Sequence, residues 1–152
     1  MIKDDEYAIL DDLDDGIKEK VLKYFQFIND GDIEAIKPFV SNSLYENQVK
    51  KYEEMKNQGL KQVYKDIIIF DNNWDVIERD EKGLKTISYM PRISIEMYVI
   101  NENTNEIVEG LIEFQEEIRY GIVLSRNDSY IEGEEGSLWI INCIDELERK
   151  PH

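Results

Sequence analysis

The side chains that most often carry catalytic chemistry are nearly missing from this chain. The single histidine is the last residue, His152, and the single cysteine is Cys143. Histidine is the usual general base and metal ligand, and it activates most serine and cysteine nucleophiles. A histidine beside Pro151 at the chain end has no neighbours to hold it in place, and no GxSxG, P-loop or GxGxxG motif occurs. The sequence therefore predicts a binding protein rather than an enzyme.

Carboxylates and tyrosines are the remaining groups that could exchange protons. Alternation places Asp66 on one face of a strand predicted over residues 61–70, and it places Glu96 on the same face as Tyr98. A carboxylate in an apolar pocket has a raised pKa and can act as a base. The alternative is that both carboxylates point to solvent or pair with a nearby Lys or Arg. The residues expected to line a cavity are Phe25, Asp66, Glu96, Tyr98 and Tyr120.

The acidic run at residues 11–16 (DDLDDG) has the charge density of a calcium-binding loop but not its spacing. With Gly16 at the sixth position of an EF-hand loop, Leu13 and Leu22 occupy positions that require an oxygen ligand and a bidentate glutamate. Zinc requires several Cys or His side chains. We therefore expect no metal and no cofactor, and we interpret this run as a solvated acidic surface.

The charge of the whole chain favours a basic partner. Asp and Glu number 34 against 18 Lys and Arg, which gives a net charge of −16. Residues 1–15 carry seven acidic side chains against one basic, and residues 101–152 carry thirteen against four. Such a field repels nucleic acid and anionic lipid, and it speeds the encounter with a basic protein. The alternative is that the charge only keeps the protein soluble.

Two acidic clusters are candidate contact surfaces, one near the N-terminus and one in the loop before the last strand, with two aromatic residues as anchors. The expected partner-binding residues are Asp11, Asp12, Asp14, Asp15, Trp74, Tyr130, Glu132, Glu134 and Glu135. An acidic, cysteine-poor chain without catalytic groups has the profile of an immunity protein, which neutralises a basic toxin or nuclease made by the same bacterium.

The apolar pattern predicts helices first and strands afterwards. Residues 1–15 are expected to form a loosely ordered acidic lead-in, residues 16–148 a single domain, and residues 149–152 a tail. Apolar residues at helical spacing predict a helix from Gly16 to residue 29, a short helix over residues 33–39, and a third helix ending near residue 57.

After Gly59 the apolar period changes from helical to alternating. Predicted strands cover residues 61–70, 74–79, 84–100 with a bend at Pro91, 106–126 with an interruption, and 137–144. This order indicates an α+β domain in which an antiparallel sheet curls around the helices. In the last strand Trp139 and Cys143 are expected in the core, and Arg126 is expected to pair with a carboxylate of the acidic C-terminal part of the chain.

Nothing in the sequence indicates export or membrane insertion. No run approaches the roughly 20 apolar residues that span a bilayer, and the N-terminus lacks the features of a signal peptide. A single cysteine gives no disulfide framework, which fits a reducing compartment. We expect a cytoplasmic protein without stable membrane insertion.

Several short motifs follow one another in a distinctive order. The opening motifs are residues 29–32 (NDGD), 39–41 (FVS) and 44–45 (LY), and the closing motif is the tryptophan-containing segment 139–144 (WIINCI). Between them lie residues 93–95, 101–106, 108–110, Glu117 and residues 120–126. This order resembles the Tim44-like domains of the NTF2-like (cystatin-like) superfamily. The resemblance covers residues 16–147 and depends on order and spacing more than on any single motif.

The resemblance implies a cone of helices and curved antiparallel sheet with a cavity or groove. Mitochondrial members contact the inner membrane and tether the import motor, so a scaffold at a membrane or secretion machinery is an alternative function. Other NTF2-like proteins bind small ligands or isomerise them, and curved sheets of this class often pair, so a homodimer is possible. The chain departs from zinc-ribbon relatives because residues 127–136 contain no cysteine.

Overall fold

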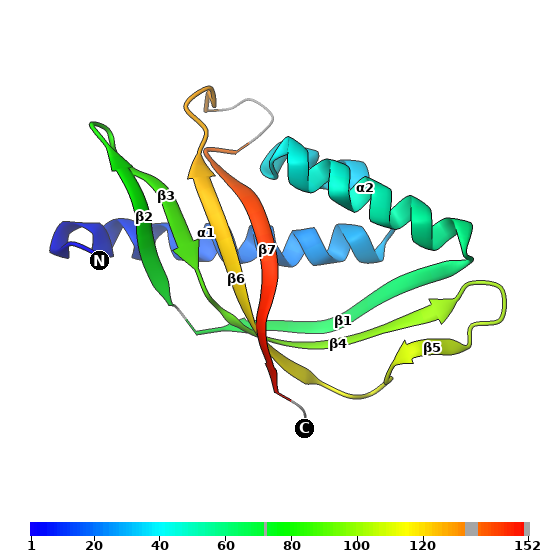
Figure 1. Ribbon diagram of the computed structural model, residues 1–152. Helices are drawn as coiled ribbons and strands as arrows, with labels where there is room; N and C mark the ends of the chain where they lie inside the picture. The colour runs from blue at the N-terminus through cyan, green and yellow to red at the C-terminus, as the bar shows by residue number, and fades with distance from the viewer. Residues whose placement is uncertain (72, 133–136, 151–152) are drawn as a thin grey trace.

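A computed structural model describes residues 1–71, 73–132 and 137–150 (Figure 1). Three helices precede seven strands, which confirms the predicted α+β class and agrees with an NTF2-like fold. The elements are α1 (Asp4–Asn29), the 3-10 helix η1 (Ile33–Phe39), α2 (Asn42–Asn57), β1 (Leu60–Phe70), β2 (Trp74–Asp80), β3 (Gly83–Tyr89), β4 (Arg92–Asn101), β5 (Ile107–Gly110), β6 (Glu116–Arg126) and β7 (Trp139–Lys150).

The antiparallel sheet branches at β6. One edge of β6 pairs with β7 over nearly its whole length, and the other edge pairs first with β4 and then with β3. Strand β4 continues to β1 and carries β5 at its far end, while β3 continues to β2. The two arms diverge, so the sheet curves; α1 runs across it and α2 lies over the β1–β7 side (Figure 1).

The core fills the space between α1 and the strands around β6. The apolar stripe of α1 packs there, with Ile17, Val21 and Phe25 at most 3% exposed. Alternate residues of β3, β4 and β6 complete the core, as period-two alternation requires when one face of a sheet is buried. Trp139 is 5% exposed, which confirms its predicted place in the core.

The start of α1 was predicted wrongly. The helix begins at Asp4 rather than Gly16, so the predicted lead-in is helical and the boundary at residues 15 and 16 falls inside α1. The acidic residues that suggested a solvated lead-in include Asp4, Asp5 and Glu6 in the first turn, where negative charge favours a helix. Leu10, which is buried, extends the apolar stripe by two turns.

A bidentate ion pair joins Glu6 in the first turn of α1 to Arg79 of β2. Arg79 donates from Nε to Glu6 Oε2 at 2.7 Å and from Nη2 to Glu6 Oε1 at 2.8 Å. The backbone nitrogen of Lys3 also donates to Glu6, at 2.9 Å. These hydrogen bonds, with that of Arg79 contributing most, lower the pKa of Glu6 from 4.5 to about 2.

We expect Glu6→Gln to lower the melting temperature at pH 7, with a difference from the parent chain that shrinks as pH falls from 4.5 towards 2. The carboxylate has a lower pKa in the folded chain, so its stabilisation is present above the unfolded pKa and is lost as the group becomes protonated. Thermal unfolding at several pH values measures this difference. Asp12→Asn, an exposed position of the same helix, is the control. An effect of Glu6→Gln that is independent of pH would contradict the assigned ion pair.

The last strand also differs from its predicted length. Strand β7 extends to Lys150, six residues beyond the predicted end, because its polar second half pairs with the first half of β6, from Tyr120↔Glu146 to Glu117↔Lys150. The predicted tail over residues 149–152 therefore begins inside a strand, and residues 151–152 lie outside the described part. The second half of β7 is held in the sheet by backbone pairing with β6. Its polar residues do not alternate with apolar ones, so the sequence contains no sign of this extension.

Candidate functional site

A hollow lies between α2, the arm formed by β4, β1 and β5, and the second half of β7. It has a volume of about 610 Å³ and joins a smaller hollow of about 260 Å³ through four shared residues, which are Lys51, Tyr64, Met97 and Glu146. We call the joined space the concave cavity. Of the residues predicted to line a cavity, Phe25, Tyr98 and Tyr120 line this one.

The inner wall of the concave cavity is aromatic. The ring of Phe25 meets Tyr24, Tyr64 and Tyr120 edge-to-face, with centroid distances of 5.5, 5.0 and 5.6 Å. Burial raises the pKa of all three tyrosines, that of Tyr64 to about 12. The hydroxyl of Tyr24 already has a hydrogen bond with Gln48, which leaves the protonated phenols of Tyr64 and Tyr120 as donors for an acceptor in the cavity.

The rim of the concave cavity is charged. Arg149 pairs with Glu116 at 3.0 Å and with Glu146, so its guanidinium is already neutralised. Lys51 lines both parts of the cavity and forms no ion pair with any described residue. The carboxylates of Glu109 and Asp145 also line the cavity, so it combines the ammonium group of Lys51 and the phenols of Tyr64 and Tyr120 with acceptor groups of its own, which suits a small polar ligand.

Asp66 and Glu96 are not among the described residues that line the concave cavity. Asp66 is exposed, with a φ of 51°, where the β1–β4 register shifts between Lys65 and Ile68. Glu96 is buried, and its Oε1 accepts a hydrogen bond from the backbone nitrogen of Glu113. The structure brings three predicted cavity residues together and directs these two carboxylates elsewhere, Asp66 because of a bulge that strict alternation could not reveal.

The N-terminal acidic cluster is divided by the helical period. Asp11, Asp12 and Asp15 are exposed on the outer face of α1, where Asp4 and Asp5 precede them by two turns. Asp14 is 6% exposed, and its Oδ2 atom forms an ion pair with Nζ of Lys18 at 2.9 Å. The outer acidic face of α1, defined as Asp4, Asp5, Asp11, Asp12 and Asp15, is therefore the surface that remains available.

Only part of the second acidic cluster lies in the described residues, and the two aromatic anchors are not fully exposed. Glu132 is exposed, whereas Glu134 and Glu135 lie outside the described residues. Trp74 and Tyr130 are both half-buried. Trp74 stacks on Tyr89 with ring centroids 4.3 Å apart, and its indole nitrogen is buried. A partner can therefore reach only part of the Trp74 ring.

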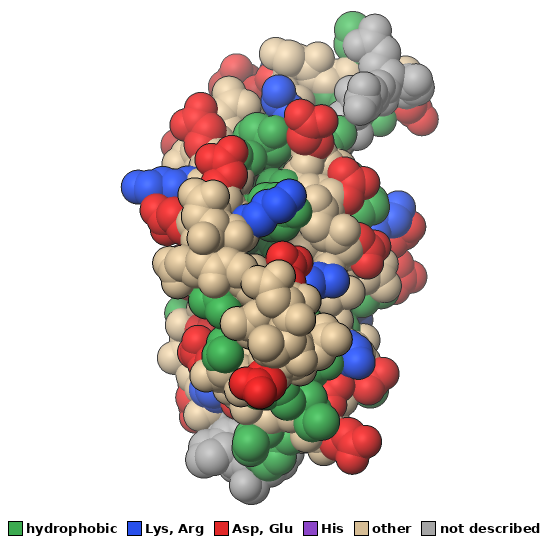
Figure 2. Space-filling model, turned by 90° about the vertical axis from the view of Figure 1, so that its right-hand side faces the viewer, with side chains coloured by type: hydrophobic (Ala, Val, Ile, Leu, Met, Phe, Trp, Pro, Cys, Tyr) green, Lys and Arg blue, Asp and Glu red, His purple; other side chains and the backbone are tan. Residues whose placement is uncertain are grey.

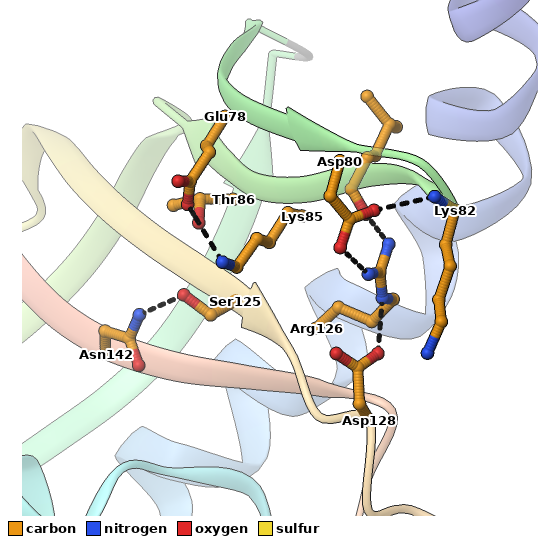
Figure 3. A network of polar contacts seen from close by, with 10 residues as sticks. Glu78, Asp80, Lys82, Lys85, Thr86, Ser125, Arg126, Asp128 and Asn142 are labelled. Atoms are coloured by element: carbon orange, nitrogen blue, oxygen red, sulfur yellow. Dashed lines mark hydrogen bonds and ion pairs between the residues drawn. The ribbon is translucent and has the colours of Figure 1, made fainter.

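All five arginines form ion pairs within the chain. The pairs are Arg79 with Glu6, Arg92 with Asp71 and Glu117, Arg119 with Asp71, Arg126 with Asp80 and Asp128, and Arg149 with Glu116 and Glu146. Figure 3 shows Arg126 between Asp80, at 2.5 Å, and Asp128, at 2.8 Å. Arg126 therefore pairs with one carboxylate of the acidic C-terminal part, Asp128, and also with Asp80 at the end of β2, which was not predicted.

Comparison with known protein families finds no match for this chain, and no curated protein matches it at a significant level. Within the described ranges, no helix is both long enough and apolar enough to cross a bilayer. The same residues contain no group of three or more His, Cys, Asp or Glu side chains placed to hold a metal ion.

Proposed function

We propose that this chain is a non-catalytic, cytoplasmic protein-binding module that binds a basic protein partner. In its sharpest form it is an immunity protein that neutralises a basic toxin or nuclease. The observation that carries this proposal is the distribution of charge pairing. Every guanidinium group is neutralised within the chain, whereas the outer acidic face of α1 has no basic side-chain partner among the described residues.

Uncompensated surface carboxylates favour a basic partner for two physical reasons. They create a negative potential that attracts a positive surface from a distance and raises the association rate. They also repel phosphate-rich ligands, and no arginine is left unpaired to bind a phosphate bidentately. Nucleic acid and anionic membranes are therefore poor candidate partners.

The proposal is tested by a pull-down of the tagged chain from a lysate of the cells that encode it, at low and at high salt. We expect one stoichiometric basic protein whose recovery falls as salt rises, because salt screens exposed charges. Toxicity of that protein, relieved by this chain, would establish the immunity role. Recovery of no protein, or of an acidic protein bound equally at both salt concentrations, would contradict the proposal.

A second candidate function is binding of a small ligand in the concave cavity. Lys51 and the phenols of Tyr64 and Tyr120 favour it, because they can bind the acceptor oxygens of such a ligand. A ligand present at 100 times its Kd would stabilise the fold by about 2.7 kcal/mol, which thermal unfolding detects. Absence of stabilisation by any carboxylate, sugar or phosphate compound in a screen would exclude this candidate.

We also place the chain, as a proposal, in the Tim44-like branch of the NTF2-like superfamily, on the motifs given above. The observed order of helices and curved sheet supports the broader superfamily. Tim44-like membership raises the alternative of a scaffold at a membrane or secretion machinery. Co-sedimentation with anionic vesicles tests it, and the acidic surface leads us to expect no binding.

A further inference from the structure

Strand β5 leaves one of its two edges open. It pairs with β4 through Tyr98↔Gly110, Val99↔Glu109 and Ile100↔Ile107, and no other strand of the described chain pairs with it. All four residues of β5 are exposed. An open edge presents backbone N–H and C=O groups to which another extended chain can bond.

The open edge carries apolar side chains. Ile107, Val108, Leu111 and Ile112 are between 39% and 61% exposed. Figure 2 shows the side of the molecule that is on the right in Figure 1. Near its lower end, at the height of β5 in Figure 1, hydrophobic side chains lie beside acidic ones. Soluble proteins usually protect an edge strand with charge or cover it, because an exposed apolar edge invites another chain. This surface therefore has the composition of a contact site.

The residues between the apolar positions are acidic. Residues 102–113 contain Glu102, Glu106, Glu109 and Glu113 and no Lys or Arg, and their carboxylates form no ion pair with the described residues. Antiparallel pairing of β5 with a second copy of itself would bring glutamates together, and like charges on opposed strands are destabilising. The charge pattern therefore selects a basic strand over a second copy of this chain.

The geometry of β5 is fixed before any partner arrives. Gly110 has a φ of 84°, and a Cβ atom there would lie 2.7 Å from the carbonyl oxygen of Met97, so the strand sits close against β4. Just beyond it, the backbone nitrogen of Glu113 donates to the buried Glu96. A pre-ordered edge lowers the entropy cost of adding a strand.

We propose that the open edge of β5 is the docking site for an extended segment of the protein partner in which basic and apolar residues alternate. The segment adds to β4–β5 as a further antiparallel strand. Its backbone bonds the free edge, its apolar side chains cover the four exposed aliphatic residues, and its lysines or arginines meet the glutamates. This inference rests on the proposed function, for which it supplies the contact surface.

The test uses the full chain and three synthetic eight-residue peptides, KVKVKVKV, EVEVEVEV and KVKPKVKP. The third peptide has the charge of the first but cannot form a continuous strand, because proline lacks an N–H group. We expect the first peptide to shift the NMR signals of residues 107–112 and to slow exchange of the outward-facing β5 amides. The other two peptides are expected to bind at least about 10-fold more weakly.

A charge-reversal variant checks the surface. Glu106→Lys combined with Glu109→Lys is expected to weaken KVKVKVKV binding at least about 10-fold and to let EVEVEVEV bind. Glu34→Lys combined with Glu46→Lys makes the same change of net charge on η1 and α2, and it is expected to leave the affinity within about 2-fold. Equal effects of the two double variants would overturn the docking site.

The two proposals can fail separately. If a basic partner is captured from the lysate but the β5 variant binds it as the parent chain does, the partner docks elsewhere and only the edge proposal is wrong. If KVKPKVKP binds as tightly as KVKVKVKV, charge alone holds the peptide and strand addition is also wrong. If KVKVKVKV binds β5 as described but no basic partner exists in the cell, the proposed function fails while the site remains.

Discussion

Replacing Ile122 with alanine is expected to lower the free energy of unfolding by about 3 kcal/mol. Ile122 is fully buried in the middle of β6, where it pairs with Tyr89 of β3 on one side and Ile144 of β7 on the other. Alanine would leave a cavity where two arms of the sheet meet α1, and the surrounding strands are held on both sides and cannot collapse into it.

Urea unfolding followed by tryptophan fluorescence measures this change, since Trp139 lies in the same core. The matched control is Ile68→Ala on β1, where the side chain is 60% exposed and the change should stay within about 0.5 kcal/mol. A loss of less than about 1 kcal/mol for Ile122→Ala would mean that β6 is not the centre of the core.

Replacing Gly110 with alanine is expected to release β5 from β4 and to abolish binding of KVKVKVKV. The added Cβ atom would lie 2.7 Å from the carbonyl oxygen of Met97 and 2.9 Å from the Cα atom of Tyr98. Both contacts are with backbone, so the clash is relieved only if the two strands move apart. The positive φ adds strain of about 1–3 kcal/mol.

Gly83→Ala is the control that separates the effect of backbone strain at a positive φ from the effect of a steric clash of the added Cβ atom. Gly83 also has a positive φ, of 110°, but no atom lies within 4 Å of its added Cβ. We expect Gly83→Ala to destabilise the chain without changing exchange at residues 107–110, whereas Gly110→Ala removes protection of the β5 amides. Retained protection and peptide binding in Gly110→Ala would show that the close approach to β4 is not needed.

The order of helices and strands could be predicted from the sequence, because the spacing of apolar residues differs between helices and strands. The change from helical to alternating period at Gly59 marks the observed end of the helices, and every predicted strand has a counterpart in the sheet. Trp139, which lies on a regular alternating stripe, was therefore placed correctly in the core.

The missed features depend on contacts between distant parts of the chain. Helix α1 begins early because Glu6 meets Arg79, 73 positions away, and the pair compensates acids that alone suggested a solvated segment. The bulge after Lys65 exposes Asp66 against simple alternation, and β5 separates from β6 through a turn around Gly110. The one local signal that pointed to the β5 edge was the apolar run over residues 107–112 broken by a glutamate.

Part of the lining of the concave cavity could be predicted from the sequence. The cavity aromatics Phe25, Tyr98 and Tyr120 come from three different elements, and all three were among the residues predicted to line a cavity. Lys51 was not predicted as a lining residue, because which part of α2 lies over the curved sheet depends on tertiary packing. Which carboxylates remain free could not be predicted from sequence, because the pairing of the arginines depends on contacts between distant parts of the chain.

The central claim, that an acidic module attracts a basic protein, is tested most directly by association kinetics with the captured partner. We predict that the association rate constant of the parent chain falls at least about 10-fold between about 50 mM and about 500 mM salt. Asp11→Lys combined with Asp12→Lys should lower the rate at low salt and flatten this dependence, while the Glu34 and Glu46 double variant should not. A rate independent of salt in the parent chain would contradict the account.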